Sequence, residues 1–421
     1  MNIDQRNGVY RALWKGALCA ALLLFAGGEC RAQENAAQPG KKAGAPKPEF
    51  KIYGFAMMDA GYDFNQVDPD WFDVVQPTKL PSFQNEFAPD GTTYFSVRQT
   101  RFGVQADTPT ELGNLMTIFE FELFGVGDDA GQTTFRLRHA YGELGQFGAE
   151  QYWSPFMDID VFPNSLEYWG PPGMVFFRNI QFRWMPIKGD TRLTFALERP
   201  GASSDNGRFS EAIRLDDVKE KFPMPDISGE FRYGKEWGYV EIAGTYRRIE
   251  WKDLGTDEFD LSGSANGWGL NFSSNLKLAP RNVIKFQAVY GKAIENYLND
   301  ASIDLGIVPN RGDRVRPLLA KALPVLGIVA FYDHGWSERF SSSFGYSLHR
   351  ITNTIGQEDD AFNRGDYALA NLLYYPVPDV MVGGQFQYGR RKNFRDGFSA
   401  NDYRIQFSFK YKFSFTLGGT S

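Results

Sequence analysis

The sequence predicts an all-β protein that closes into a 16-stranded antiparallel transmembrane β-barrel. Between Phe50 and Phe413 apolar residues recur with period two, and no helical spacing persists long enough to indicate a helix. Aromatic residues make up 16% of the chain, although its mean hydropathy is only −0.38. A barrel in a membrane explains both values, because only alternate residues face lipid while aromatic side chains collect at the two membrane interfaces.

The last predicted strand shows this alternation most clearly. Its two faces are Tyr403, Ile405, Phe407, Phe409, Tyr411 and Phe413 on one side and Arg404, Gln406, Ser408, Lys410 and Lys412 on the other. The same pattern recurs at 119–123, 180–184 and 284–290. A face that consists only of large apolar groups is better suited to lipid than to the packed interior of a soluble β-sandwich.

The connections between the predicted strands alternate between short and long. Short turns are expected near 108–113, 145–148, 186–190, 234–236, 279–282, 334–336 and 376–379. Longer connections are expected near 64–91, 127–132, 154–176, 201–227, 253–264, 294–324, 352–364 and 391–401. Seven turns and eight connections join sixteen strands and place both ends of the barrel chain on the short-turn side. This is the arrangement of bacterial outer-membrane barrels, although one miscounted hairpin would change the count by two strands.

The start of the chain has the character of a secretory signal peptide. Arg11 and Lys15 precede a short apolar run, Ala17–Ala26, which small and polar residues follow, so cleavage after Ala32 is expected. Both cysteines of the chain lie in this segment, and lipid attachment at Cys30 is the competing interpretation. Export of a barrel protein predicts the outer membrane of a Gram-negative bacterium.

The rest of the chain divides by composition. Residues 33–49 are rich in Ala, Gly, Pro and Lys and are expected to form a flexible periplasmic linker. Residues 50–413 form the predicted barrel, and residues 414–421 are expected to be a C-terminal tail.

Charge and histidine content exclude several classes of function. The formal net charge is −6, and removing the four basic and two acidic residues of 1–32 makes it −8, which argues against a nucleic-acid partner. The three histidines, His139, His334 and His349, fall on or beside three different predicted strands, without metal-ligand spacing or a catalytic dyad. The sequence therefore predicts no metal site, no cofactor and no enzymatic activity.

Several arginines alternate with apolar residues and are expected to face the lumen. Arg136 and Arg138 alternate with Phe135 and Leu137, and Arg183 lies between Phe182 and Trp184. A charge on the lipid side at mid-membrane costs roughly 2–4 kcal/mol, which is enough to decide the orientation. Two further pairs of positions extend the set: Arg192 and Arg232 are candidates by alternation, whereas Arg98 and Arg101 cannot both point inward unless a bulge separates them.

The third long connection, residues 154–176, mixes aromatic residues and prolines with three acids. Its apolar side chains are better buried inside the barrel than exposed to water, so the connection is expected to fold inward. Asp158, Asp160 and Glu167 would then face the arginines across the pore and create a transverse field that sorts solutes by charge. The alternative is an extracellular loop that packs against a neighbouring subunit.

A basic run lies at the end of the penultimate predicted strand. It comprises Arg390, Arg391 and Lys392, with Arg395 in the connection that follows. These residues are placed to meet phosphorylated lipopolysaccharide, or else they form a solvated loop.

Two long stretches carry a resemblance to a known family. They are RQTRFGVQADTPTELGNLMTIFEFELFG, from Arg98, and FRLRHAYGELGQFGAEQYWSPFMDIDVFPNSLEYWG, from Phe135. These stretches resemble the DcaP-like porins, and the resemblance runs from about Phe50 to Phe413. The order of an arginine-rich strand, paired glutamates and an AYGEL strand before the third connection is more weakly similar to the general trimeric porins.

The resemblance implies a homotrimer of 16-stranded barrels, a constriction set by the third connection, and a preference for small anions such as dicarboxylates and aromatic carboxylates. Carried over to this sequence, the implied basic wall is Arg98, Arg136, Arg138 and Arg183, and the implied acids of the constriction are Asp158, Asp160 and Glu167. Two departures are visible. Some members of the family carry an N-terminal coiled coil before the barrel. Residues 33–49 hold prolines and no heptads, so no such coiled coil is expected here. The chain also continues past Phe413, where strands of this kind usually end on an aromatic residue, which weakens this assembly signal or moves it to Phe415.

The predicted function is passive diffusion of small solutes through an outer-membrane porin. Two other classes remain open at this point. An outer-membrane barrel enzyme of lipase or protease type would need a serine, a histidine and an acid placed together. A secreted glycan-binding β-protein would use the aromatic residues as stacking platforms and would be soluble without detergent.

Overall fold

A continuous ladder of backbone hydrogen bonds closes the barrel. The computed structural model describes residues 47–210 and 213–418, so the predicted signal peptide and all but the last three residues of the predicted linker lie outside the described residues. Each wall strand pairs antiparallel with the next, and β20 closes the barrel by pairing with the whole length of β1, from Glu49 opposite Gly418 to Asp63 opposite Arg404. The described strands are β1 (Glu49–Asp63), β2 (Thr92–Ser96), β3 (Arg101–Thr110), β4 (Gly113–Phe124), β5 (Thr133–Leu144), β6 (Phe147–Trp153), β7 (Arg178–Ile187), β8 (Arg192–Glu198), β9 (Val218–Lys221), β10 (Asp226–Lys235), β11 (Gly238–Asp253), β12 (Gly263–Ala279), β13 (Asn282–Lys292), β14 (Leu305–Pro309), β15 (Leu318–Ala322), β16 (Pro324–Gly335), β17 (Phe340–Ile351), β18 (Phe362–Val377), β19 (Val380–Asn393) and β20 (Ser399–Gly418).

Eighteen of these twenty strands belong to the barrel sheet, and they occupy sixteen strand positions in its wall. β2 and β3 both pair with β1 and share one position, and β9 and β10 in the same way both pair with β11. β14 and β15 form a separate hairpin within the connection between β13 and β16. The predicted all-β, 16-stranded antiparallel barrel is confirmed.

Helical structure in the described part of the chain consists of short 3-10 turns. They are η2 (Pro69–Trp71), η3 (Pro77–Lys79), η4 (Gly127–Asp129), η5 (Ile159–Val161), η6 (Gly207–Phe209) and η7 (Glu295–Tyr297). Within residues 47–210 and 213–418, no helix is long and apolar enough to cross a membrane.

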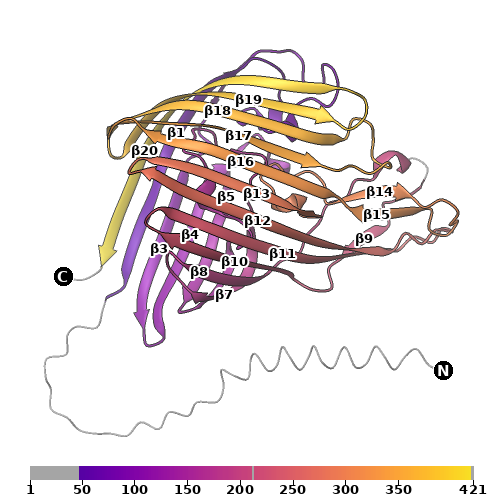
Figure 1. Ribbon diagram of the computed structural model, residues 1–421, viewed down its shortest axis with the longest axis horizontal. Coiled ribbons are helices and arrows are strands. Elements are labelled where there is room, and N and C mark those ends of the chain that lie inside the picture. Colours follow the sequence, from indigo (N-terminus) through magenta and orange to yellow (C-terminus); the bar gives the residue numbers. More distant parts are fainter. Residues whose placement is uncertain (1–46, 211–212, 419–421) are drawn as a thin grey trace, which may run out of the picture. The chain divides into compact units, whose positions relative to one another are not determined.

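Short turns and long connections alternate around the barrel as predicted. The turns are 111–112, 145–146, 188–191, 236–237, 280–281, 336–339 and 378–379. β1 begins and β20 ends on the same side as these turns, and the β14–β15 hairpin projects from the opposite end (Figure 1). The barrel therefore has a short-turn end and a long-connection end.

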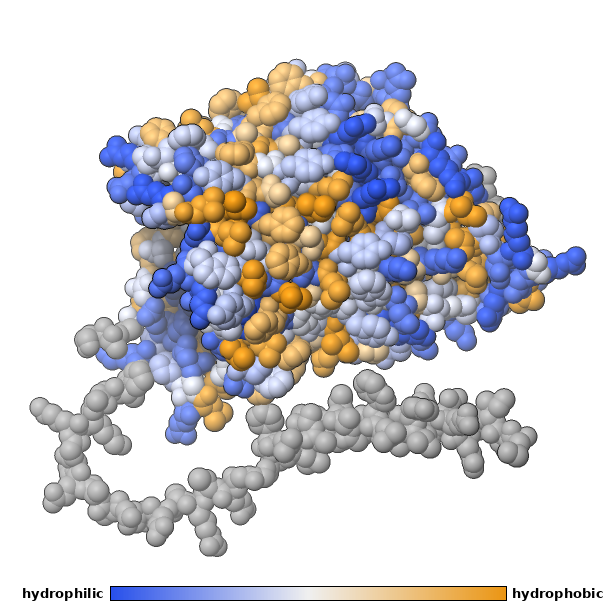
Figure 2. Space-filling view, viewed as in Figure 1, coloured by the Kyte–Doolittle hydropathy of each residue, from blue (hydrophilic) through white to orange (hydrophobic). Residues whose placement is uncertain are grey.

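The two faces of each strand differ as the alternation requires. Exposed apolar residues and their buried polar chain neighbours include Phe119 and Glu120, Phe182 and Arg183, Phe231 and Arg232, Ile242 and Glu241, Phe272 and Asn271, and Phe407 and Gln406. Apolar side chains gather in a band across the strands, with polar residues toward the ends (Figure 2). The outward face suits lipid, and the inward face carries the polar chemistry.

Two irregularities bring extra arginines to the inner face. Residues 97–100 interrupt the ladder between β2 and β3, where the Thr100 N–H donates to the Val97 carbonyl over 3.0 Å. This break is the bulge that lets both Arg98 and Arg101 point inward. A second bulge lies in β5, where Glu120 pairs with His139 but Phe121 pairs with Leu137. Because the ladder skips Arg138, adjacent residues of β5 both become buried.

The structure extends the last strand beyond the predicted end of the barrel. β20 continues through Gly418, and Ser414 to Gly418 pair with Tyr53 to Glu49. The reason is that the alternation does not stop at Phe413: Phe415 and Leu417 remain outward and exposed. Of the expected tail 414–421, residues 414–418 therefore belong to the wall, and 419–421 lie outside the described residues.

Deleting residues 414–421 should leave a barrel that is less stable to heat. The deletion removes the five pairs that close β1 against β20 at the short-turn end, and it leaves backbone groups without partners near lipid. The measurement is the temperature at which the folded band disappears in detergent gel electrophoresis. Deleting only 419–421 is the control, and equal unfolding temperatures for the two deletions would show that the five pairs do not stabilise closure.

Candidate functional site

A group of arginines surrounds two carboxylates on the inner wall between β3 and β7. We define it as the basic cluster: Arg101, Arg136, Arg138 and Arg178 with Glu120 and Glu122. Arg138 Nε lies 2.7 Å from Glu120 Oε1, and Arg178 Nη2 lies 3.5 Å from Glu122 Oε1. Four cations face two carboxylates, so the cluster carries a formal excess of two positive charges.

The arginines of the basic cluster are not equally constrained. Arg138 is bonded to both glutamates and its side chain is 4% exposed. Arg136 approaches only Glu122, at 3.7 Å, and its side chain is 27% exposed. Within the described residues, Nη1 of Arg136 and Nη1 of Arg178 have no hydrogen-bond partner. Nε of Arg101 also has no hydrogen-bond partner there, so three of the four arginines keep an unused N–H group.

The side chains of Arg136 and Arg178 line the same cavity. Its volume is about 360 Å³, and Tyr168 and Trp169 of the third long connection also line it. Planar guanidinium groups beside aromatic rings form a surface that fits a carboxylate on a flat molecule.

The other two predicted wall arginines lie elsewhere. Arg98 is completely buried, where it pairs with Asp73 at 2.6 Å and lies 3.8 Å from the centre of the Phe124 ring. Arg183 is also buried, and its Nη2 donates to the Trp153 carbonyl and to Gln181. Both arginines hold parts of the wall and its connections together, whereas Arg136 and Arg138 belong to the basic cluster.

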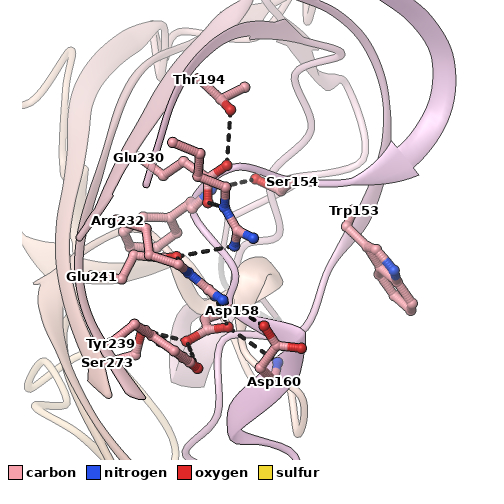
Figure 3. Close-up of polar contacts among 12 residues, drawn as sticks. Trp153, Ser154, Asp158, Asp160, Thr194, Glu230, Arg232, Tyr239, Glu241 and Ser273 are labelled. Atoms are coloured by element: carbon pink, nitrogen blue, oxygen red, sulfur yellow. Dashed lines mark hydrogen bonds and ion pairs between the residues drawn. The ribbon is translucent and has the colours of Figure 1, made fainter. Parts of the chain in front are cut away.

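A second group on the neighbouring strands has the opposite balance. We define it as the acidic cluster: Arg192 and Arg232 with Asp158, Asp160, Glu230 and Glu241 (Figure 3). Arg232 sits at its centre, with contacts of 2.6 Å to Asp158, 2.5 Å to Asp160 and 2.6 Å to Glu241. Two cations face four carboxylates, which leaves a formal excess of two negative charges.

Asp158 fixes the third long connection, residues 154–177, to the wall. It is completely buried and accepts hydrogen bonds from Tyr239 Oη at 2.7 Å and Ser273 Oγ at 2.6 Å, besides its pair with Arg232. Asp160 also pairs with Arg232, but its side chain is 48% exposed. Asp158 is thus an anchor, and Asp160 is the acid that remains exposed to solvent.

Glu167 lies in a different environment from the other two acids. It is buried and accepts hydrogen bonds from the Val75 N–H at 2.9 Å, the Gly170 N–H at 2.7 Å and Tyr367 Oη at 2.8 Å. Burial raises the pKa of Glu167 to about 7, because desolvation outweighs these three donors.

The connection 154–177 continues along the inner face as far as β19. The Phe162 carbonyl accepts from Lys285 Nζ at 2.5 Å, and the Leu166 N–H donates to Gln385 at 2.8 Å. Val161 and Met174 pack against wall residues that include Val329. The acids of this connection do not pair with the four arginines of the implied basic wall. Asp158 and Asp160 pair with Arg232, which alternation gave as a further candidate, and Glu167 has no arginine partner among the described residues.

Sequence reasoning missed Arg178 as a site residue for a structural reason. Strict alternation with Ile180 would turn Arg178 outward. β5 pairs with β6 only from Ala140 to Leu144, and past the end of that ladder Arg178 reaches Glu122. A gap in pairing between consecutive strands leaves no signal in the alternation of either one.

No metal centre is present in the described residues: residues 47–210 and 213–418 hold no group of three or more histidine, cysteine or acidic side chains placed to bind an ion.

Replacing Arg232 by alanine should destabilise the protein strongly. Three carboxylates would lose their shared cation, and an unpaired buried charge costs roughly 3–5 kcal/mol. The measurement is the midpoint of unfolding in denaturant. Arg192→Ala is the matched control, because Arg192 belongs to the same cluster but its side chain is 30% exposed. Equal losses in the two variants would show that the third connection does not depend on Arg232.

Stability should fall as pH rises from about 4.5 to about 7, in part through Glu167. A carboxyl whose pKa is raised in the folded state binds its proton more tightly there than in the unfolded chain. Its stabilising contribution is therefore complete below the ordinary pKa and is lost as pH rises through about 7. Thermal unfolding followed by circular dichroism should show a smaller loss in Glu167→Gln. An identical pH slope in both proteins would contradict this assignment.

Comparisons with known proteins support the barrel and identify its family. The model of the family described as DcaP outer membrane protein matches residues 28–253, which is more than half of the chain. The outer membrane channel DcaP of Acinetobacter baumannii superposes with a TM-score of 0.72 at 20% identity, covering 90% of this chain and all of that one.

More distant structures share the fold alone. An anion-selective porin from Comamonas acidovorans has a TM-score of 0.55 at 8% identity over 87% of this chain and 100% of that one. OmpT of Vibrio cholerae has a TM-score of 0.52 at 10% identity over 87% and 98%. No curated protein is similar enough to count as a relative. The match of the family model over more than half of the sequence and the closed 16-stranded barrel lead to one conclusion: this chain belongs to the DcaP outer membrane protein family, in the outer membrane of a Gram-negative bacterium.

Proposed function

We propose that this channel is a passive diffusion porin that favours small anions. The observation that carries the proposal is the excess of arginine over carboxylate in the basic cluster. The chain as a whole is acidic, but charges farther away than a Debye length of about 8 Å are screened at physiological salt. Charges on the pore wall act on a passing ion at close range, so the local excess decides selectivity.

The solutes are small carboxylates, including dicarboxylates and aromatic carboxylates. Arg136 and Arg178 bring guanidinium groups to the cavity that can bind a carboxylate, and Tyr168 and Trp169 offer flat faces in the same cavity. The segment 154–177 forms the constriction, because its hydrogen bonds follow the inner face from β10 to β19.

Two charged walls of opposite sign line the proposed path. The basic cluster occupies β3 to β7, and the acidic cluster follows on β8, β10 and β11 with Asp160 exposed. This arrangement supports a transverse field at the constriction.

We also propose that the channel assembles as a homotrimer and contacts lipopolysaccharide.

Neutralising Arg136 should lower the preference for anions. One unit charge acting at about 10 Å through water changes an ion's local concentration by about twofold. The measurement is the reversal potential across a salt gradient in a planar bilayer, where Arg136→Gln should shift toward cations. Asp160→Asn should shift the opposite way. Arg138 is left intact because it is buried and paired, so its loss would disturb the wall.

Lys292→Gln is the matched control, because this exposed lysine ends a strand whose neighbouring Tyr290 faces outward. A control that shifts as far as Arg136→Gln would assign the effect to surface charge. A native channel that prefers cations would overturn the proposed selectivity, and a folded protein that conducts no ions would overturn the porin itself.

A further inference from the structure

A cluster of cations lies on the outward face of β17, β18 and β19. We define it as the outer basic site: Arg350, Arg364, Arg390 and Lys392. Apolar residues of the same parity on these strands are exposed to the outside: Phe344 and Tyr346 on β17, Leu372 on β18 and Phe386 on β19. The four cations therefore face away from the lumen, at the long-connection end of the lipid-facing band.

The strand register sets like charges directly against one another. Arg350 lies opposite Arg364 across β17 and β18, and Arg364 lies opposite Lys392 across β18 and β19. Like charges opposite each other in an antiparallel pair are destabilising. A row of three cations across three neighbouring strands thus carries a cost that an anion would remove.

The chain itself supplies one carboxylate to this site. Asp366 pairs with Arg364 at 2.6 Å and accepts a hydrogen bond from Tyr346. Within residues 47–210 and 213–418, Arg350, Arg390 and Lys392 form no ion pair. Asp366 also lies opposite Arg390 in the register, so one carboxylate serves four cations. A formal excess of three positive charges remains around a surface hollow of about 290 Å³, which Asn363 also lines.

The surroundings of the hollow select one kind of anion. Directly along the same three strands lies the apolar surface of Phe344, Leu372 and Phe386. A free anion would use only the cations, whereas a lipid that carries phosphate would use the cations and the apolar surface together. Long connections of outer-membrane barrels lie on the outside of the cell, so the site faces the outer leaflet.

We propose that the outer basic site binds the phosphate groups of lipid A, the phosphorylated glycolipid anchor of lipopolysaccharide. This inference rests on the proposed contact with lipopolysaccharide but not on solute passage, so conductance and lipid binding fail independently. Arg391 of the basic run does not take part: it is buried and donates to the carbonyls of Thr78 and Asp360. Arg350 and Arg364 take its place, although they lie far from the run in sequence.

Lipid A binding to the detergent-purified full chain tests the proposal, with native mass spectrometry and a titration as the readouts. Bisphosphorylated lipid A should bind the native protein, and Arg350→Gln with Lys392→Gln should weaken this binding about thirtyfold. The matched control is Arg248→Gln with Lys292→Gln, which removes two cations at the same end of the barrel from β11 and β13. The control should bind as the native protein does.

Further arms separate the sources of phosphate. Lipid A stripped of both phosphates should bind the native protein no better than it binds the double variant. If the native protein bound the stripped lipid as tightly as intact lipid A, phosphate recognition would be overturned. Inorganic phosphate that binds at the site as tightly as lipid A does would overturn a lipid occupant. Equal weakening in the control pair would reduce the site to general surface charge and overturn it as well.

Discussion

Closure of the backbone ladder is the constraint on which the rest of this structure depends. Lipid offers no hydrogen-bond partners, so every N–H and C=O of the wall must be satisfied by a neighbouring strand. The pairing of β20 with β1 removes the last free edge. Once the strands are fixed, each residue has one of two directions, and this choice separates the apolar outer surface from the polar lumen.

The interior is organised by ion pairs of unequal composition. A buried arginine is costly unless carboxylates or other acceptors satisfy it, and carboxylates take this part in both inner clusters. Neither cluster is neutral, however: the basic cluster holds two carboxylates too few, and the acidic cluster holds two too many. The third connection shares in this balance, because Asp158 is both an anchor of the connection and a partner of Arg232. The same contacts thus set both the position of the third connection and the charge of the inner wall beside it.

The sequence was sufficient for features that depend on period and spacing. Alternation and turn lengths predicted sixteen strands, and parity predicted that Arg136 and Arg138 face inward. It was insufficient where the period breaks: the bulge at Arg138 brings His139 inward, and the end of the β5–β6 ladder brings Arg178 to Glu122. The sequence also did not predict which charged residues form ion pairs, because Arg232 lies 74 residues from Asp158 and no local pattern connects them.

Glu167 links parts of the protein that the sequence keeps far apart. Its carboxyl joins the first long connection at Val75, the third at Gly170, and the wall at Tyr367. Surface loops of barrels ordinarily accept insertions and deletions freely. Here the two connections share one buried group, so a change of length before Val75 displaces a partner of the third connection. In related chains the first and third connections should therefore change together. Changes of length should be confined to the parts of these connections that do not contact Glu167.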